Sequence, residues 1–431
     1  MKRAENGFFC LLYLTLGTYA VPALRISMGD SAIPYGVLFA SILVIVLIAR
    51  LLKEHASIYL SQVLLLFIIV YLLSIVVSTS IAQSPDAGIT TKSALFSMTP
   101  LLVACVSDNV KVVRRALLCL AISGFAVFVY GAYGFVTGKI GSPSEHLFGF
   151  FGVTYEPATR NGDMLFLQST FWILLSIWLF GKPGRLKPAY AIGSVLLAAG
   201  MLLSLVRGTW IATGATLIFI LILGSRYRPR IRQTFSMFLL FLAATLVGIT
   251  ILLGPEQIEL IVHRFATLST LSLEGGSSNL ARIELAKRIF GIIAVNPLGV
   301  GVGNVRYFLV DFFTGPLNHA ENVYLNLCVE QGIIGVAIFI LLLVWVIARL
   351  MRFLRVKDRL AEDVWVGWAL LGIMISWLVY GFFNSMVDSM WYWFVLGLAV
   401  SLSNLTEREM LRQRGRTPAL PFSAYTAKPT S

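Results

Sequence analysis

The sequence has few charged residues for its length. Only 13% of its 431 residues are Asp, Glu, Lys or Arg, whereas soluble domains carry about 25%. Hydrophobic residues make up 58% of the chain, and so few charges could not cover that apolar surface in water. These proportions exclude a secreted disulfide scaffold, a disordered chain and an ordinary cytosolic enzyme. They predict an all-α membrane protein that crosses the bilayer many times.

Cysteine and histidine are also scarce. Four cysteines do not form a disulfide framework, and three of them lie in apolar runs, which indicates small buried side chains. The four histidines are scattered, and no Asp-x-Asp pair occurs. The sequence therefore predicts no metal site, no cofactor and no cation-dependent sugar-nucleotide transferase.

Apolar runs of about 17–25 residues are long enough to cross a bilayer. Twelve such runs are present, and they predict twelve transmembrane helices. The run at 93–107 is the shortest and contains Pro100. The first run follows Lys2 and Arg3 and also has the features of a signal peptide. The runs are 7–24, 32–49, 58–80, 93–107, 116–137, 163–181, 188–206, 208–224, 234–254, 331–350, 364–384 and 388–404.

Basic residues cluster in every second connection along this series, most densely at 226–232 and 349–359. With a cytoplasmic N-terminus, every cytoplasmic segment is basic, as the positive-inside rule requires. Both termini are therefore predicted to be cytoplasmic. Because topology explains most of the net charge of +13, we expect no nucleic-acid partner.

One connection is much longer than the others and is polar and rich in glycine, namely 255–330. Helices are predicted near 256–268 and 279–294 within it. Long connections in compact proteins are usually functional, so we expect the site here, on the outer side of the membrane. The predicted organisation is a transmembrane bundle of spans 1–9 (1–254), this helical loop (255–330), spans 10–12 (331–404) and a disordered cytoplasmic tail (405–431).

The loop contains a glycine-rich stretch, Asn-Pro-Leu-Gly-Val-Gly-Val-Gly-Asn at 296–304. It lacks the full spacing, the strand context and the acidic residue of a dinucleotide-binding loop. We interpret it as a tight turn that brings backbone close to a site at the membrane surface.

Arg207 lies between two apolar runs with almost no loop, in Ser-Leu-Val-Arg-Gly-Thr-Trp at 204–210. Arginine at a membrane boundary is costly unless it snorkels to headgroups or pairs. One interpretation is snorkelling. The other is an anion clamp, because a guanidinium stays charged and binds phosphate oxygens in a bidentate fork.

Further arginines stand in the long loop. Arg282 is a second candidate for anion binding, although a surface ion pair with Glu284 or Glu321 also explains it. Arg264 and Arg288 are better explained as solvated side chains than as part of an anion site.

The densest polar cluster is Asn-His-Ala-Glu-Asn-Val-Tyr-Leu at 318–325. A helix is predicted to start near Ala320 and to run into the tenth span. Either His319 or Glu321 could act as general base for a hydroxyl. Alternatively, Glu321 complements the helix dipole and Asn318 is a cap.

Together these segments resemble the O-antigen ligase and polymerase-like membrane proteins of bacterial surface-polysaccharide assembly. The resemblance rests on 204–210, on Arg282 upstream of 296–301, and on 319–325 running to Gly-Ile-Ile-Gly at 332–335. It covers about residues 204–335, and no single piece is specific. The predicted spans and the large outer loop before the tenth, a GT-C-like arrangement, agree with it.

The resemblance implies a glycosyltransferase in the bacterial inner membrane with a periplasmic active site. The donor would be a glycan on undecaprenyl pyrophosphate, and the acceptor a growing polymer or lipid A–core. Arg207 and Arg282 would bind the donor pyrophosphate without a metal, and Glu321 or His319 would be the base. The supporting residues would be Asn322, Tyr324, Arg264 and Arg288.

Ligases of this family typically carry histidine directly before the motif asparagine, nine residues ahead of the Gly-x-x-Gly. Here Asn322 is in that register and is preceded by Glu321. An acidic residue at this position resembles the polymerase members, so we predict an O-antigen or exopolysaccharide polymerase. The alternatives are a ligase that transfers the glycan to lipid A–core and, in another class, a multispan lipid-linked glycan flippase or transporter.

Overall fold

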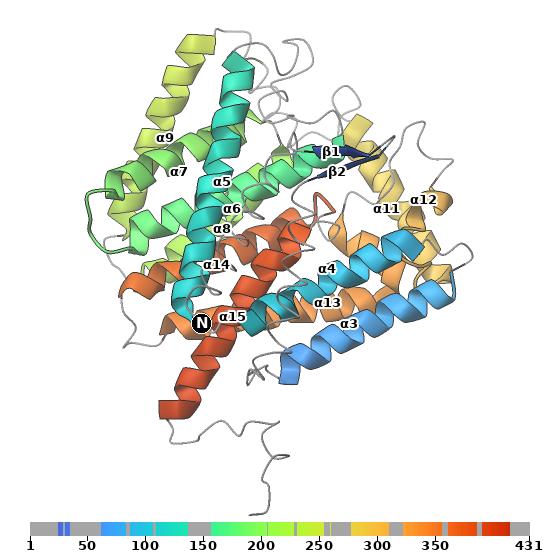
Figure 1. The fold of residues 1–431 in the computed structure, drawn as a ribbon. Helices are drawn as coiled ribbons and strands as arrows, with labels where there is room; N and C mark the ends of the chain where they lie inside the picture. The colour runs from blue at the N-terminus through green and yellow to red at the C-terminus, as the bar shows by residue number, and fades with distance from the viewer. Residues whose placement is uncertain are drawn as a thin grey trace, which may run out of the picture.

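The computed structural model is a bundle of helices with one short pair of strands (Figure 1). It describes residues 25–28, 31–34, 62–82, 87–106, 109–136, 157–204, 206–227, 231–253, 259, 277–309, 322–355, 361–385 and 390–413. The helices are α3 (Gln62–Ser80), α4 (Ala87–Val106), α5 (Val110–Val136), α6 (Pro157–Phe180), α7 (Lys187–Leu203), α8 (Arg207–Gly224), α9 (Ile231–Leu253), α11 (Ser277–Val295), α12 (Val305–Phe308), α13 (Val323–Arg355), α14 (Ala361–Tyr380) and α15 (Met390–Gln413).

Six of the described helices contain a segment that is long and apolar enough to cross a membrane. These helices are α3, α5, α8, α9, α13 and α14. Two shorter apolar helices lie in α6 and α7. Large apolar side chains on these helices are exposed, for example Leu66, Ile218, Ile222 and Leu240. Outward-facing apolar residues of this size suit lipid rather than water. The chain is therefore a helical membrane protein, as its composition predicts.

The predicted spans from the third onward each overlap a helix, with ends that differ by up to nine residues. Pro100 is accommodated inside α4. The first predicted span and the helix predicted near 256–268 lie outside the described residues, apart from residue 259.

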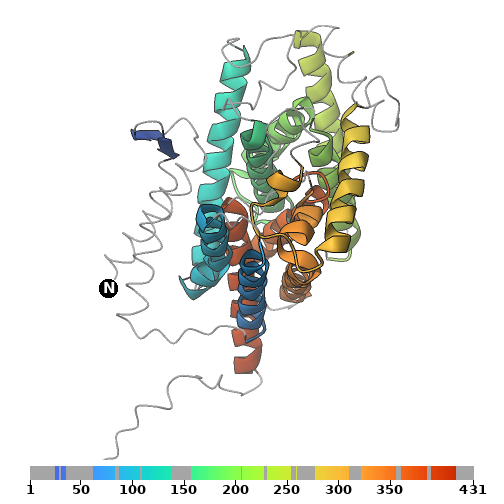
Figure 2. The ribbon, with the colours of Figure 1, turned by 90° about the vertical axis from the view of Figure 1, so that its right-hand side faces the viewer.

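The second predicted span begins too early. Strand β1 (Arg25–Met28) pairs antiparallel with β2 (Ser31–Pro34), so that Ile26 faces Ile33. Residues 32–34 therefore belong to a strand and not to the start of a helix. The β-branched isoleucines favour an extended backbone. Figure 2 shows this pair outside the helical bundle.

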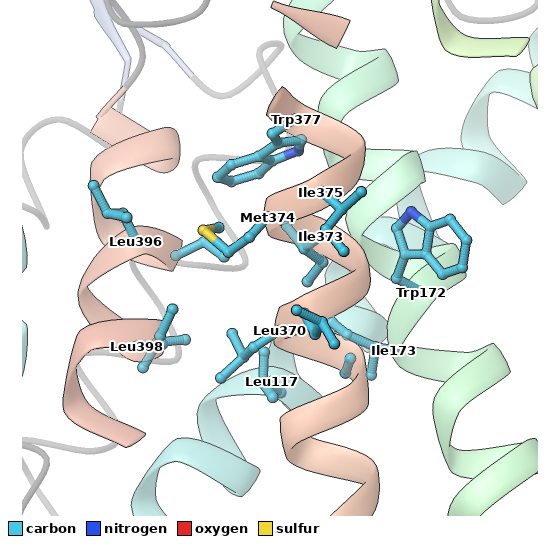
Figure 3. Close-up of a cluster of buried hydrophobic side chains, with 14 of the residues drawn as sticks. Leu117, Trp172, Ile173, Leu370, Ile373, Met374, Ile375, Trp377, Leu396 and Leu398 are labelled. Atoms are coloured by element: carbon cyan, nitrogen blue, oxygen red, sulfur yellow. The ribbon is translucent and has the colours of Figure 1, made fainter. Parts of the chain in front are cut away.

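Helix α14 is at the centre of the bundle and is apolar on every side. It packs against α5, α6, α8, α13 and α15. Figure 3 shows its core residues between α6, which contributes Trp172 and Ile173, and α15, which contributes Leu396 and Leu398. The rings of Phe180 and Trp368 stack with centroids 4.4 Å apart. A helix that is apolar all round is buried by neighbouring helices. This packing fixes the position of both ends of α14.

Helices α3, α4, α13 and α15 form the adjoining part of the bundle (Figure 1). Helix α13 has 33 residues and is broken at Gly332, where φ is 75° and ψ is −178°. At 1.5 Å per residue the whole helix would be about 50 Å long, which exceeds a hydrocarbon core of about 30 Å. The break therefore separates a bilayer-length segment after Gly332 from a shorter segment, Val323–Gln331, before it.

Candidate active site

Arg207 is the first residue of α8, and Val206 precedes it with extended dihedral angles and no side-chain cap. The turn from α7 is tight, because the Ser204 hydroxyl donates to the Met201 carbonyl at 2.6 Å and accepts from the Val206 N–H at 3.4 Å. The Arg207 side chain is half-buried. A positive side chain at the positive end of a helix dipole is unfavourable, so helix stability does not explain arginine here.

The first turn of α8 contacts the segment that ends α14. We call that segment, Gly381–Ser385, the end-turn. A Cβ placed on Gly208 would come within 2.6 Å of Phe383 Cβ and 3.3 Å of a Tyr380 ring carbon. The α8 backbone at Gly208 thus packs against the Phe383 and Tyr380 side chains and leaves no room for a side chain at this position. Arg207 is thereby held directly beside the end-turn.

The start of α13 contacts the same end-turn. Asn322 caps α13, because its Oδ1 accepts from the N–H groups of Tyr324 (2.9 Å) and Leu325 (3.1 Å). Its Nδ2 donates to the Phe382 carbonyl at 3.2 Å. The Val323 N–H donates to the Gly381 carbonyl at 2.8 Å. Helix α13 therefore begins at Val323, three residues later than the predicted start near Ala320.

Tyr324 also stabilises the contact between the start of α13 and the end of α14. Its hydroxyl donates to the Leu378 carbonyl of α14, and its ring lies 4.6 Å from that of Phe382. Three sequence-predicted residues from distant parts of the chain, Arg207, Asn322 and Tyr324, are thus gathered around one end of α14.

The glycine-rich stretch packs against the break in α13. The Val300 N–H donates to the Val329 carbonyl (2.8 Å), the Gly301 N–H to the Glu330 carbonyl (3.0 Å), and the Ile333 N–H to the Pro297 carbonyl (3.0 Å). The stretch is a tight turn with positive φ at each of its three glycines, as predicted. These hydrogen bonds satisfy the backbone N–H and C=O groups that have no partner within α13 because of the break at Gly332.

Side-chain hydrogen bonds of the two residues before Gly332 stabilise the break in α13. Glu330 is buried, and its carboxylate accepts from the Gly303 N–H at 3.0 Å. The buried Gln331 amide donates to the Tyr71 hydroxyl at 3.1 Å and accepts from the Ser74 hydroxyl at 3.1 Å, both on α3. The first segment of α13 is therefore held in one place relative to α3.

Gly332→Ala is expected to prevent this arrangement. Alanine is strained at this φ and ψ, and its Cβ would lie 2.5 Å from the Leu298 carbonyl carbon and the Pro297 oxygen. We expect a loss of at least about 3 kcal/mol of folding free energy, measured as a lower Tm of the detergent-purified protein. The matched control is Gly214→Ala in α8, where a Cβ meets nothing within 4 Å. Equal Tm values for the two variants would contradict the account of the break.

Arg282 and Arg288 lie on α11 and are both exposed. Helix α11 packs on the first segment of α13 through Leu285 and Ile289, which contact a cluster that includes Val300, Val305 and Val329. Arg282 precedes Leu285 and Ile289 by three and seven residues, so it lies on the face of α11 that turns toward α13. Glu284, one of its predicted partners, forms an ion pair with Lys287 at 3.7 Å.

Three predicted site residues, His319, Glu321 and Arg264, lie outside the described residues. Within the part of the chain that the structure describes, no three His, Cys, Asp or Glu side chains come together as a metal site. The end-turn is a part of the site that the sequence does not mark. The end-turn lies at the edge of an apolar run, and only its contacts reveal its position.

The fold and these contacts define a helical membrane protein in which three predicted site residues, Arg207, Asn322 and Tyr324, lie around one end of a central helix. Residues 192–340, about a third of the chain, match the family model described as O-antigen ligase. The resemblance seen in the motifs is confirmed, because this part of the chain is similar to the O-antigen ligase family. The match supports a role in glycan transfer during polysaccharide assembly. No curated protein matches the chain.

Proposed function

We propose that the protein is a polymerase of the O-antigen or exopolysaccharide type. It transfers a glycan from undecaprenyl pyrophosphate to an acceptor saccharide at the periplasmic face of the inner membrane. The observation that supports the proposal is that the first turn of α8, which carries Arg207, and the residues Asn322 and Tyr324 all lie against the end-turn. An arginine is thereby held near the start of α13, which His319 and Glu321 precede in the sequence.

In the proposed reaction an acceptor hydroxyl attacks the anomeric carbon of the donor glycan. The bond from that carbon to the pyrophosphate oxygen breaks, and undecaprenyl pyrophosphate leaves. Arg207 and Arg282 bind the pyrophosphate and stabilise its growing negative charge, while Arg264 and Arg288 add positive charge near it. Glu321 or His319 accepts the proton from the acceptor hydroxyl.

The relative placement of helix ends supports the proposed topology. The start of α8, the start of α13 and the end of α14 are all predicted on the periplasmic side, and they meet. The Ala82 side chain, just after α3, lies against Gly301 of the glycine turn, also as that topology requires. At the other end of α13, Arg349 pairs with Glu407 of α15 at 3.3 Å, and both are predicted to be cytoplasmic.

The topology has a direct test in a variant whose four native cysteines are replaced by serine. An impermeant thiol reagent added to intact spheroplasts should label Ser277→Cys at the start of α11. It should not label Arg228→Cys, in the predicted cytoplasmic connection, until the membrane is permeabilised. The reverse labelling pattern would overturn the orientation.

A ligase that attaches glycan to lipid A–core is the second candidate, and the description of the matched family favours it. Deletion of the gene should cause different products to accumulate, depending on which of the two activities is lost. Loss of a polymerase should leave single repeat units on the acceptor lipid. Loss of a ligase should leave long polymer on undecaprenyl pyrophosphate and bare lipid A–core. Restoration of chain length by the cloned gene is the result that the proposal predicts.

A further inference from the structure

Helix α11 exposes apolar side chains, although it is not among the six described helices that are long and apolar enough to cross a membrane. Ile283 is 42% exposed and Phe290 is 60% exposed. They are about two helical turns apart and therefore share one face of α11. Ala286 and Ala294 lie on the same face and are at least partly exposed. We call these four residues the apolar row.

Charged side chains border the apolar row on both edges. Successive residues of a helix are about 100° apart around its axis, so Arg282 and Glu284 lie on either side of Ile283, and both are exposed. Arg288 is also exposed and lies about 160° around the helix from Phe290. An exposed apolar row with charged borders is the pattern of a helix that lies on a membrane surface.

The end of α11 lies at the level where the lipid-facing surface of α13 begins. The Ile333 N–H donates to the carbonyl of Pro297, which follows the last residue of α11 by two positions. From the break onward, one face of α13 exposes the large apolar residues Ile333, Ile334, Ile340, Leu341 and Val344. Figures 1 and 2 show α11, in yellow, crosswise to α13 rather than alongside it. A helix that ends at this level and lies crosswise to a bilayer-length segment runs along the membrane surface.

We propose that α11 lies in the outer leaflet of the membrane, with the apolar row against the lipid acyl chains. Exposed apolar side chains are favourable there and unfavourable in water. Arg282 and Glu284 then lie at the depth of the lipid phosphates, where Glu284 is neutralised by its ion pair with Lys287. Arg282 is thereby placed at the depth where the pyrophosphate of a lipid-linked donor lies. The choice of leaflet rests on the proposed function, whereas the contact of the apolar row with lipid does not.

Lipid is the occupant that two observations favour, namely the charged borders of the apolar row and the level at which α11 meets the lipid-facing face of α13. The other candidate occupants are a second copy of the chain and a part of this chain outside the described residues. Either of them would shield the apolar row from lipid. A direct measurement of lipid contact therefore separates the three.

The measurement uses single-cysteine variants of the full-length protein, made after the four native cysteines are replaced by serine. Each cysteine carries a fluorophore, and the proteoliposomes contain phospholipid with a nitroxide quencher at a shallow or a deep acyl-chain position. We expect the shallow nitroxide to quench Ile283→Cys and Phe290→Cys about 3-fold more strongly than Arg288→Cys, the matched control on the same helix. Leu240→Cys on α9, where the side chain is 71% exposed, should be quenched more strongly by the deep nitroxide.

Equal quenching at residues 283, 288 and 290 would overturn the inference and assign the apolar row to a protein contact. Because quenching needs no glycan transfer, the result is independent of the proposed function. If the apolar row is quenched but wild type does not transfer glycan, the proposed function fails and the surface helix stands. If wild type transfers glycan and the apolar row is not quenched, the surface helix fails and the proposed function stands. Labelling of Ser277→Cys only after permeabilisation would overturn the outer leaflet and the proposed periplasmic site together.

Discussion

Arg207→Ala is expected to abolish glycan transfer while the protein accumulates in the membrane at its normal level. The side chain is half-buried at the start of α8, where the helix dipole opposes a positive charge. Removing a group that stabilises charge in a transition state typically costs a factor of about 100 to 1,000 in rate, roughly 3 kcal/mol. Transfer is measured as polymer length in cells and as release of undecaprenyl pyrophosphate in vitro.

Two further variants sharpen this prediction. Arg207→Lys should also be poor, because an ammonium group cannot form the bidentate contact of a guanidinium. Arg232→Ala, at the exposed start of α9 and on the predicted cytoplasmic side, is the matched control and should transfer normally. Near-normal polymer length from Arg207→Ala would leave snorkelling to headgroups as the role of this arginine.

Glu321→Gln is expected to cost more activity than His319→Ala. Glu321 directly precedes Asn322, which is bonded both to the start of α13 and to the Phe382 carbonyl. Adjacent Cα atoms are about 3.8 Å apart, and Glu321 is therefore one residue from Asn322. His319 precedes Asn322 by three residues. Glutamine keeps the shape of the side chain but does not accept the proton as a carboxylate does.

The comparison requires matched membrane levels of the two variants near neutral pH. Initial rates of transfer in isolated membranes, with lipid-linked donor at saturation, give the ratio directly. An inactive His319→Ala variant beside a mildly impaired Glu321→Gln variant would reverse the assignment. It would also favour the ligase alternative, because the reaction would then depend on histidine.

The helices could be predicted from sequence because the thickness of a bilayer sets the length of an apolar run. Each predicted span from the third onward overlaps a helix, and six of these helices are long and apolar enough to cross a membrane. The motif residues Arg207, Asn322 and Tyr324 were also found from sequence, because arginine and asparagine are conspicuous beside apolar runs.

The details of the junctions could not be predicted. The Glu-Gln pair at 330–331 ends the apolar run, but it does not reveal that the helix continues on its far side with a break at Gly332. The break is stabilised by backbone partners in the glycine turn, which lies about 30 residues upstream. The end-turn gave no signal, since Phe382 and Phe383 continue an apolar run. The second span was placed too early because Ala32 and Ile33 suit a membrane helix as well as a strand.

The central claim, that Arg207 acts on a lipid-linked pyrophosphate donor, has one most direct measurement. Purified protein in proteoliposomes receives undecaprenyl-pyrophosphate-linked repeat units and acceptor oligosaccharide, and released undecaprenyl pyrophosphate is quantified over time. The account predicts release by wild type only when acceptor is present, and release about 100-fold slower or less from Arg207→Ala. Equal release by wild type and Arg207→Ala, or no release from wild type with both substrates present, would contradict it.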